Sequence, residues 1–409
     1  MKKLIINNKS IFIPTIILII ASRLVAFYFY RDLSLENEWS NLFHNLNISG
    51  VLGFNVLINE FLALQKFAEA GDVVIPSVWM PPLYSYFLYA VNIISGNFFP
   101  LVTSVIIIQI LLNLISIYVF YLLIRRFLSR KNSLLFALVY ALFPVLIFSS
   151  VQISSISIQI FLIINFFYFI TGLIFENKKN SLLFFSVISG LLILIRGEFI
   201  FFYILTLIYF FIFKERKLKK MIASLLITFI IISPYLLRNY KNLDILVLTK
   251  SFGYNLLKGN NKNFKVEGDV SVINEIRENV NIKITNDYEI KLDDIYKNEA
   301  IKYISNNPVL SIKNYFIKVF SFLFIDFNSS YKNYYHPAHT IPKLILSFLS
   351  LLGAILGLKY KGFYQYMSFY YFSNIFLFSV FFILPRYSVI LAPVQLILIS
   401  LAIKYFFKR

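Results

Sequence analysis

The sequence predicts an all-α polytopic membrane protein with about ten transmembrane helices, juxtamembrane helices and a small external domain of mixed structure. Three observations predict this class. Of the 409 residues, 59% are hydrophobic and 14% are charged, whereas soluble domains are about half apolar and about a quarter charged. Apolar stretches long enough to cross a bilayer recur along the whole chain. Lysine and arginine cluster at the ends of these stretches, as they do beside cytoplasmic loops.

The net charge of +19 would suggest a nucleic-acid partner if the protein were soluble. The basic residues instead follow the apolar stretches, so we expect no nucleic-acid partner. There are no cysteines, which excludes disulfides, thiolate metal sites and cysteine nucleophiles. Residues 11–30 are a long apolar stretch without a small-residue cleavage site after it. They therefore predict the first membrane helix and not a removed signal peptide.

Loop charges predict the topology of the first half. Three lysines before residue 10 place the N-terminus in the cytoplasm, so the first helix leads outward to an external loop. Residues 81–96 open with two prolines and are short for a span, which favours a helix on the outer surface. Residues 100–124 then cross inward to the basic cluster at 125–131. If residues 81–96 crossed instead, this cluster would lie outside, against the positive-inside bias.

The later apolar segments alternate in direction and end in a basic tail. The expected crossings are 133–150, 155–175, 181–196, 199–213, 221–237, 341–358, 364–384 and 387–405. Residues 309–326 are interrupted by Lys313 and Lys318, which favours a second helix along the outer interface. Both termini are then cytoplasmic. The predicted division is a transmembrane module over 1–238 with its external catalytic loop at 31–99, an external insert at 239–309, and an interfacial helix with C-terminal spans at 310–409.

Acidic residues gather in two external segments. Ten of the twenty acids lie in residues 239–309, where residues 286–307 show helical spacing of apolar positions before Asn306-Asn307-Pro308. Six more lie in the loop at 31–83, which also holds both tryptophans. Glu36 and Glu38 follow the membrane exit closely and stand beside Trp39. One of the two is our candidate catalytic base, since a spacing of two residues points them to opposite faces of an extended chain. For the acids Glu60, Glu69 and Asp72 we favour a solvated surface.

Four arginines fall where the positive-inside rule does not explain them: Arg23, Arg196, Arg238 and Arg386 are all expected near the outer half of the membrane. A charged side chain at this depth needs a partner. The planar guanidinium group suits a phosphate, which it can bind through two hydrogen bonds. We therefore predict an anionic ligand, such as a lipid phosphate, at the external face. Alternatives remain: Arg23 could bond another helix, Arg196 could pair with Glu198, and Arg238 could extend to the headgroups.

The sequence supports no certain cofactor. His336 and His339 flank a Pro-Ala pair, but the proline and the absence of nearby carboxylates argue against a metal site there. A divalent cation is possible without being supported by any motif. No nucleotide-binding glycine loop and no Ser-His-Asp pattern is visible.

An ordered series of short motifs extends over nearly the whole chain. They are Glu36 to Trp39, Asn45-Leu46, Gly53-Phe54, Pro81 to Tyr84, Gly190 to Arg196, Arg238-Asn239, Gly253 to Leu256, Gly259 to Asn261, Asp294 to Pro308, and Arg386-Tyr387 with Pro393. In this order the chain resembles bacterial glycosyltransferases of the GT-C superfamily. The branch is that of glycosyltransferase family 39, which includes protein O-mannosyltransferases and is related to the aminoarabinose transferase of lipid A.

This resemblance implies a GT-C-like fold and an inverting transfer of a sugar from a polyprenyl-phosphate donor on the external, periplasmic face of the inner cell membrane. The acceptor would be a hydroxyl of a glycolipid, a glycan or a protein. A loop carboxylate would act as base, and the loop residues Trp39, Pro81, Pro82 and Tyr84, with Tyr387, would line the substrate site.

The sequence departs from the family pattern in two ways. Both candidate bases are glutamates where relatives usually have an aspartate, and Ile156 stands where relatives often carry an acid. The alternative functions are a lipid-linked oligosaccharide flippase or other transporter, and an O-antigen-type polymerase. The sequence identifies neither the sugar nor the acceptor.

Overall fold

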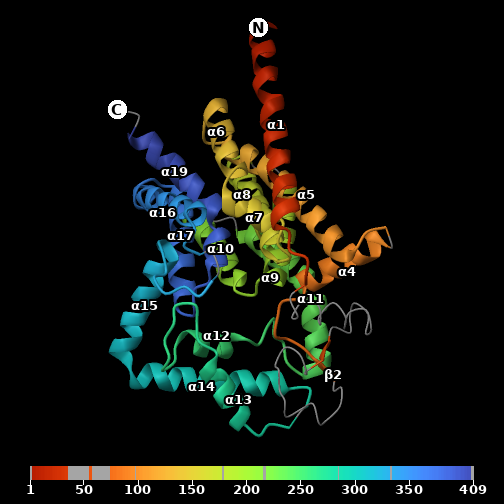
Figure 1. Ribbon diagram of the computed structural model, residues 1–409, viewed down its shortest axis with the longest axis vertical. Helices are drawn as coiled ribbons and strands as arrows, with labels where there is room; N and C mark the ends of the chain where they lie inside the picture. The colour runs from red at the N-terminus through yellow and green to blue at the C-terminus, as the bar shows by residue number, and fades with distance from the viewer. Residues whose placement is uncertain are drawn as a thin grey trace.

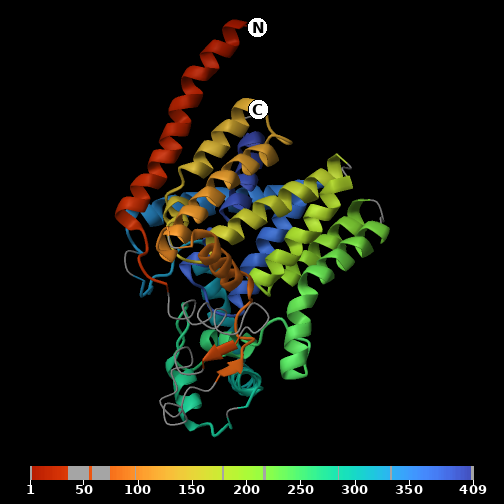
Figure 2. The ribbon, with the colours of Figure 1, turned by 90° about the vertical axis from the view of Figure 1, so that its right-hand side faces the viewer.

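The computed structural model describes residues 2–35, 55–57, 74–96, 98–176, 179–214, 218–283, 285–331 and 334–406. These residues form a bundle of apolar helices with a polar unit at one end (Figure 1). Both chain termini lie at the other end of the bundle, and Figure 2 shows the same arrangement after a quarter turn. The predicted helical fold class is confirmed. The two described strands are short: β1 (Asn55–Leu57) pairs antiparallel with β2 (Val74–Pro76).

The apolar helices begin and end within five residues of the predicted bounds, except that α1 starts earlier and α11 ends later. They are α1 (Lys2–Tyr30), α5 (Leu101–Ile124), α8 (Ile156–Phe175), α9 (Lys179–Ile195), α10 (Phe199–Lys214), α11 (Leu218–Leu243), α16 (Pro337–Gly357), α17 (Phe363–Ser379) and α19 (Ala392–Phe406). The span predicted at 387–405 is divided into α18 (Pro385–Val389) and α19. Among the described residues, α5, α8, α11 and α16 are long and apolar enough to cross a membrane, or five spans if a bent pair counts as one. Several shorter apolar helices accompany them. A multi-pass membrane protein is thus supported, and the number of ten spans stays a prediction.

The expected helix at 133–150 is wrong as a single straight element. The structure breaks it into α6 (Arg130–Ala141) and α7 (Pro144–Ser150), which are bent by 57°. Phe143 is extended, with φ −67° and ψ 118°, and Pro144 is the first residue of α7. A proline removes one backbone N–H and forces the residue before it out of the helical region. Pro144 therefore explains the bend.

Close helix packing and aromatic contacts hold the bundle together. A β-carbon added at Gly353 of α16 would lie 2.1 Å from the carbonyl oxygen of Leu398 in α19. The two backbones can approach this closely because glycine has no side chain. In the centre of the bundle, the fully buried ring of Phe167 contacts Tyr370 of α17 edge-on at 5.0 Å. The core therefore joins α8, from the first half of the chain, to α17, near its C-terminus.

Two shorter helices lie at the border between bundle and polar unit. The surface helix predicted at 81–96 corresponds to α4 (Leu83–Ser95), which projects sideways from the lower right of the bundle in Figure 1. With 13 residues it is about 20 Å long at 1.5 Å per residue, shorter than the hydrocarbon core of a bilayer. The helix α15 (Pro308–Leu323) leads from the polar unit to α17, against which it packs.

The polar unit is built on helices. It contains α12 (Phe252–Gly259), α13 (Ser271–Asn279) and α14 (Tyr288–Asn306), so the helix predicted within 286–307 is confirmed. A small apolar cluster, separate from the core of the bundle, joins these helices. Gly253 of α12 makes this packing possible, since a β-carbon there would lie 1.9 Å from the carbonyl oxygen of Asp293 in α14. The polar unit thereby places α12 directly below the membrane helices.

Candidate functional site

The two candidate bases and their neighbouring tryptophan lie outside the described residues, so Glu36, Glu38 and Trp39 stay predictions. The other end of the same loop is described. Pro81 and Pro82 lead into α4, where the buried Tyr84 donates a hydrogen bond to Oε1 of Gln109, 3.1 Å away on α5. This contact fixes the start of α4 against the membrane bundle.

The exit of the loop, residues 77–79, is held from below by a buried carboxylate. Oε2 of Glu289, on α14, accepts a hydrogen bond of 2.8 Å from the backbone N–H of Val78. Its Oε1 accepts a bond of 2.9 Å from the hydroxyl of Ser77. Burial raises the pKa of Glu289 to about 7, although the bonds from Val78 and Ser77 and the charge of Arg238 act in the opposite direction. Glu289 is 3% exposed, so its carboxyl group contacts protein and not bulk water.

The same loop exit is held from above by Arg238, near the end of α11. Its Nη1 donates to the carbonyl oxygen of Ser77 and to Oδ1 of Asn239, both at 2.8 Å. The guanidinium group is also close enough to Glu289 for their charges to interact. Arg238 was predicted to bind a donor phosphate. The structure shows one arm of its guanidinium group bound to protein oxygens.

A second arginine, Arg196, lies at the end of α9 among aromatic residues. Its Cζ lies 5.5 Å from the ring centre of Tyr387, in the short helix α18 (Pro385–Val389). Its Nη1 is 3.4 Å from Oε1 of Glu198. Its Nε is buried, without a hydrogen-bond partner in the part of the chain that the structure describes. The exposed Arg386 precedes Tyr387 and acts on it electrostatically together with Arg196. Three of the predicted site residues, Arg196, Arg386 and Tyr387, are thus brought together.

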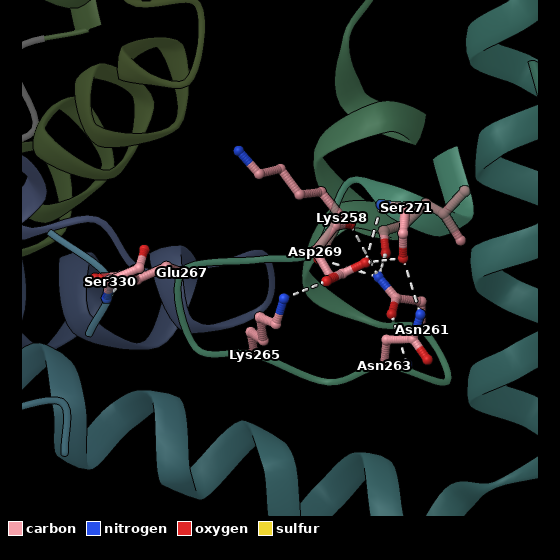
Figure 3. A network of polar contacts seen from close by, with 9 residues as sticks. Lys258, Asn261, Asn263, Lys265, Glu267, Asp269, Ser271 and Ser330 are labelled. Carbon is pink, nitrogen blue, oxygen red and sulfur yellow. Dashed lines mark hydrogen bonds and ion pairs between the residues drawn. The ribbon is translucent and has the colours of Figure 1, made fainter. Parts of the chain in front are cut away.

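A lysine that the sequence analysis did not select lies beside this group. Lys258 of α12 places its Nζ 4.3 Å from the ring centre of Phe382, and that ring lies 5.9 Å from the ring of Tyr387. In Figure 3 the ammonium group of Lys258 points away from the hydrogen-bonded loop that follows α12. That loop is fixed by Asp269, which accepts from the N–H of Ser271 at 2.9 Å. The backbone of Lys258 also contacts this loop, since its carbonyl oxygen accepts from the N–H of Asp269 at 2.9 Å.

Residues 249–259 connect the loop exit to the cations. The N–H of Lys250 donates to the carbonyl oxygen of Val78 at 2.7 Å. The ring of Tyr254 meets that of Trp79 edge-on at 4.8 Å. One helical turn further, Lys258 reaches Phe382 as described above. Because one short segment touches both, the exit of the acidic loop and the group around Tyr387 share one face of the polar unit.

The fourth predicted arginine has a different location. Arg23 is 1% exposed inside the bundle, where its Nε and Nη2 donate to Oδ1 of Asn113 on α5 at 3.2 and 3.0 Å. Its Nη1 bonds within α1, to Ser22 and to the carbonyl oxygen of Ile19. The structure therefore gives it the interhelical contacts that were the alternative to phosphate binding.

The described residues contain no group of three or more His, Asp or Glu side chains that could hold a metal ion. His336 instead caps α16, where its Nδ1 accepts from the N–H of Ala338 at 3.2 Å. His339 bonds the carbonyl oxygen of Tyr334 through Nδ1 at 2.7 Å.

Two residues of this face were missed by sequence reasoning, Glu289 and Lys258. Glu289 was counted only as one of ten external acids, because its partners lie more than 200 residues earlier in the chain. The available signal was weak: Glu289 and Asp293 are four residues apart, on one face of a predicted helix. Asp293 accepts from the N–H of Tyr254 at 2.9 Å, so the pair faces the loop exit and α12.

Residues 80–237 match the model of the family described as dolichyl-phosphate-mannose-protein mannosyltransferase. The comparison with curated proteins gave no match. Among solved structures, the chain is similar to the archaeal oligosaccharyltransferase AglB from Archaeoglobus fulgidus, solved in complex with an inhibitory peptide and a dolichol-phosphate. The identity is 13% and the TM-score is 0.48, over 96% of this chain and 50% of AglB, so the chain spans about half the length of that structure. The family match confirms the resemblance to the GT-C superfamily of glycosyltransferases, with residues 80–237 as the part that carries it.

Proposed function

We propose that this protein is an inverting glycosyltransferase that moves a sugar from a polyprenyl-phosphate donor to an acceptor hydroxyl at the external, periplasmic face of the inner membrane. The observation that carries the proposal is the group of Arg196, Arg386 and Lys258 around Tyr387 and Phe382, connected by α12 to the exit of the acidic loop. The donor named for the matched family, a dolichyl-phosphate sugar, belongs to the same chemical class. The acceptor is a glycolipid, a glycan or a protein.

The cations suit the leaving group of this reaction. When the acceptor oxygen attacks the anomeric carbon, the bond from that carbon to the phosphate oxygen breaks and its electron pair leaves with the phosphate. A phosphate is a weak base and needs no proton donor, but positive groups stabilise the charge that develops on it. Arg196 offers a fork of N–H donors, and one of them, Nε, bonds no described protein atom. Arg386 and Lys258 add positive charge from two other elements of the chain.

The base belongs to the acidic loop. The attacking hydroxyl must lose its proton, which a positioned carboxylate can accept, and such catalysis contributes roughly 10²–10⁴-fold to the rate. Glu36 or Glu38 fills this role in the proposal. Attack from the face opposite the phosphate inverts the configuration at the anomeric carbon. The phosphate site and the base therefore lie on opposite sides of the sugar.

The experiment is a transfer assay with the full-length protein in lipid nanodiscs. Labelled sugars on polyprenyl phosphate, both hexoses and pentoses, are supplied with glycolipid, glycan and peptide acceptors. We expect a labelled product of inverted anomeric configuration, and a loss of at least 100-fold in the Glu36→Ala or the Glu38→Ala protein. Glu69→Ala, in the same loop, is the matched control and should retain activity.

Two results would overturn the proposal. If the wild-type protein consumes no donor in the presence of any of the acceptor classes, the enzyme assignment is lost. Unchanged transfer by both loop variants would remove the assignment of the base. Movement of the intact lipid-linked sugar between leaflets without any transfer would identify a transporter instead.

A further inference from the structure

Glu289 is a buried carboxylate that the proposed chemistry does not use directly. It lies on α14 of the polar unit, and its hydrogen bonds go to residues 77 and 78, at the exit of the loop that holds the candidate base. Its partners are 212 and 211 residues away in sequence. Burying a carboxylate costs free energy unless it is hydrogen-bonded. The bonds to Ser77 and Val78 are therefore needed to keep Glu289 in the interior. They fix a long loop at one defined point.

The contact has three parts that converge on two consecutive peptide units, 77–78 and 78–79. Glu289 accepts from the hydroxyl of Ser77 and the N–H of Val78 on one side. Arg238 donates to the carbonyl oxygen of Ser77 on the other side. Lys250 donates its N–H to the carbonyl oxygen of Val78. Every one of these bonds is 2.7–2.9 Å long. The backbone at 77–78 therefore has little freedom to shift.

The next turn of α14 holds α12, the helix that packs against the loop exit at residues 77–79. Asp293 follows Glu289 by four residues, and its Oδ1 accepts from the N–H of Tyr254 at 2.9 Å. Tyr254 contacts Trp79, the residue that follows the fixed peptide. One face of α14 thus sets both the loop exit and the helix that carries Lys258, so the two parts of the proposed site share a single support.

We propose that Glu289 is a positioning residue: through Ser77 and Val78 it sets the exit of the acidic loop, residues 77–79, against α12 and so fixes where this exit lies relative to the cations around Tyr387. The inference rests on the proposed function. According to this inference, the polar unit contributes to catalysis although Glu289 does not touch the substrate. Misplacement of a catalytic group by about 1 Å can cost a reaction roughly 100-fold, so the loss of this contact should lower kcat more than it changes donor binding.

The first test is kinetic and uses the isosteric Glu289→Gln variant of the full-length protein. We expect kcat to fall about 10- to 100-fold while KM for the donor stays within about threefold, because the cations that hold the phosphate are untouched. Ser77→Ala should act in the same way, and the double variant should be no worse than the poorer single variant, since both remove one contact. Additive losses, or a fall that appears only in KM, would contradict the inference.

Glu299→Gln is the matched control on the same helix. The carboxylate of Glu299 is half-exposed and pairs weakly with Lys302, at 3.9 Å. The variant should therefore keep the kinetic constants of the wild type. An equal fall of kcat in Glu299→Gln would show a general effect of charge on α14 and would overturn the assignment.

The second test does not depend on transfer. In a Trp39→Phe background Trp79 is the one tryptophan left, and it is 7% exposed. We expect Glu289→Ala to shift its emission to longer wavelength and to increase quenching by acrylamide, with no change in the Glu299→Gln protein. If no donor is consumed but Trp79 responds, the proposed function fails while the contact stands. If transfer is active and neither kcat nor Trp79 responds, the positioning role fails.

Discussion

The four arginines expected near the outer half of the membrane fall into two groups that the sequence does not distinguish. Arg23 and Arg238 are buried, and protein oxygens accept hydrogen bonds from both guanidinium groups. Arg196 and Arg386 instead lie around Tyr387, where Arg196 has one carboxylate, Glu198, at 3.4 Å and Arg386 is exposed. In the first group the fold itself uses the charge. In the second group, Arg196 contacts Glu198 and Tyr387 at the edge of the bundle and Arg386 is exposed, and these are the two cations that we propose to bind the donor phosphate.

This difference predicts different consequences of mutation. Removing one partner of a buried, hydrogen-bonded charge leaves the other partner unsatisfied, so the loss appears in stability. Removing a cation that is partly exposed costs the fold little, but removes the stabilisation of the charge that develops on a leaving phosphate. Substitution of Arg23 or Arg238 should therefore lower stability, whereas substitution of Arg196 or Arg386 should lower the rate of transfer.

The largest expected effect is on transfer. Arg196→Gln and Arg386→Gln should each lower kcat/KM for the polyprenyl-phosphate donor about 100- to 1,000-fold, because each removes a positive group from the leaving phosphate. The unfolding temperature in detergent should stay close to that of the wild type. Arg125→Gln is the matched control, since Arg125 is exposed directly after α5 and, within the described part of the chain, its side chain donates to the backbone carbonyl oxygen of Leu128. A loss of stability with normal transfer would place Arg196 in the structural group.

The second effect is the pH dependence of stability at Glu289. Its pKa is about 7 in the folded protein and near 4.5 when unfolded, so between these values the folded state binds more protons. Stability should therefore fall as pH rises from about 4.5 to 7, by about 3 kcal/mol at most. Arg238, Tyr235 and Tyr288 are the charged and titratable groups that face it. Arginine and tyrosine side chains ordinarily titrate well above pH 8.

Thermal unfolding from pH 5 to 8 measures this slope. The unfolding temperature of the wild type relative to Glu289→Gln should decrease as pH rises, because the variant cannot ionise. Asp293, one turn away, is present in both proteins and cancels in the comparison. Equal slopes in the two proteins would show that Glu289 does not carry the titration.

The third effect tests the structural group directly. Arg23→Met should destabilise the bundle by about 2 kcal/mol, since it leaves Oδ1 of the buried Asn113 without its donors. Asn113→Leu should cost at least as much, because it leaves a buried cation. The double variant should be more stable than the sum of the two losses predicts, as expected for partners in one contact. Additive losses would show that the two side chains act independently.

Local patterns of sequence predicted most of the fold. Apolar runs and loop charges predicted the helices because both signals lie within the segment itself. The helix at 133–150 was wrong as a single element, because the bend at Pro144 was not considered. The helix at 387–405 was also wrong as a single element, since it is divided after Val389 into α18 and α19. The candidate site was harder to predict from the sequence. Arg196 and Arg386 were selected as misplaced charges, and their common neighbour Tyr387 was selected as part of a motif.

Contacts between distant segments could not be predicted in this way. The partners of Glu289 lie more than 200 residues away, and no feature of residues 77–78 marks them as its acceptors or donors. Lys258 is one of many lysines in the polar segment, and its position over Phe382 follows from the packing of α12 against residues 381–382. That packing depends on Gly259, where a β-carbon would lie 2.0 Å from the carbonyl oxygen of Phe381. A glycine in a helical turn does not by itself reveal what it packs against.

Lys258 gives the smallest predicted effect, and its backbone and its side chain have different roles. Its backbone bonds the loop of the polar unit that follows α12, whereas its ammonium group lies over Phe382, whose ring is 5.9 Å from that of Tyr387. Lys258→Gln keeps the backbone and much of the side-chain length but removes the charge, so KM for the donor should rise about tenfold with little change in stability. Lys262→Gln is the control, since Lys262 pairs with Glu275 at an exposed position. A rise in KM that disappears at high salt would indicate action through charge, and a salt-independent change would assign Lys258 to the packing of α12.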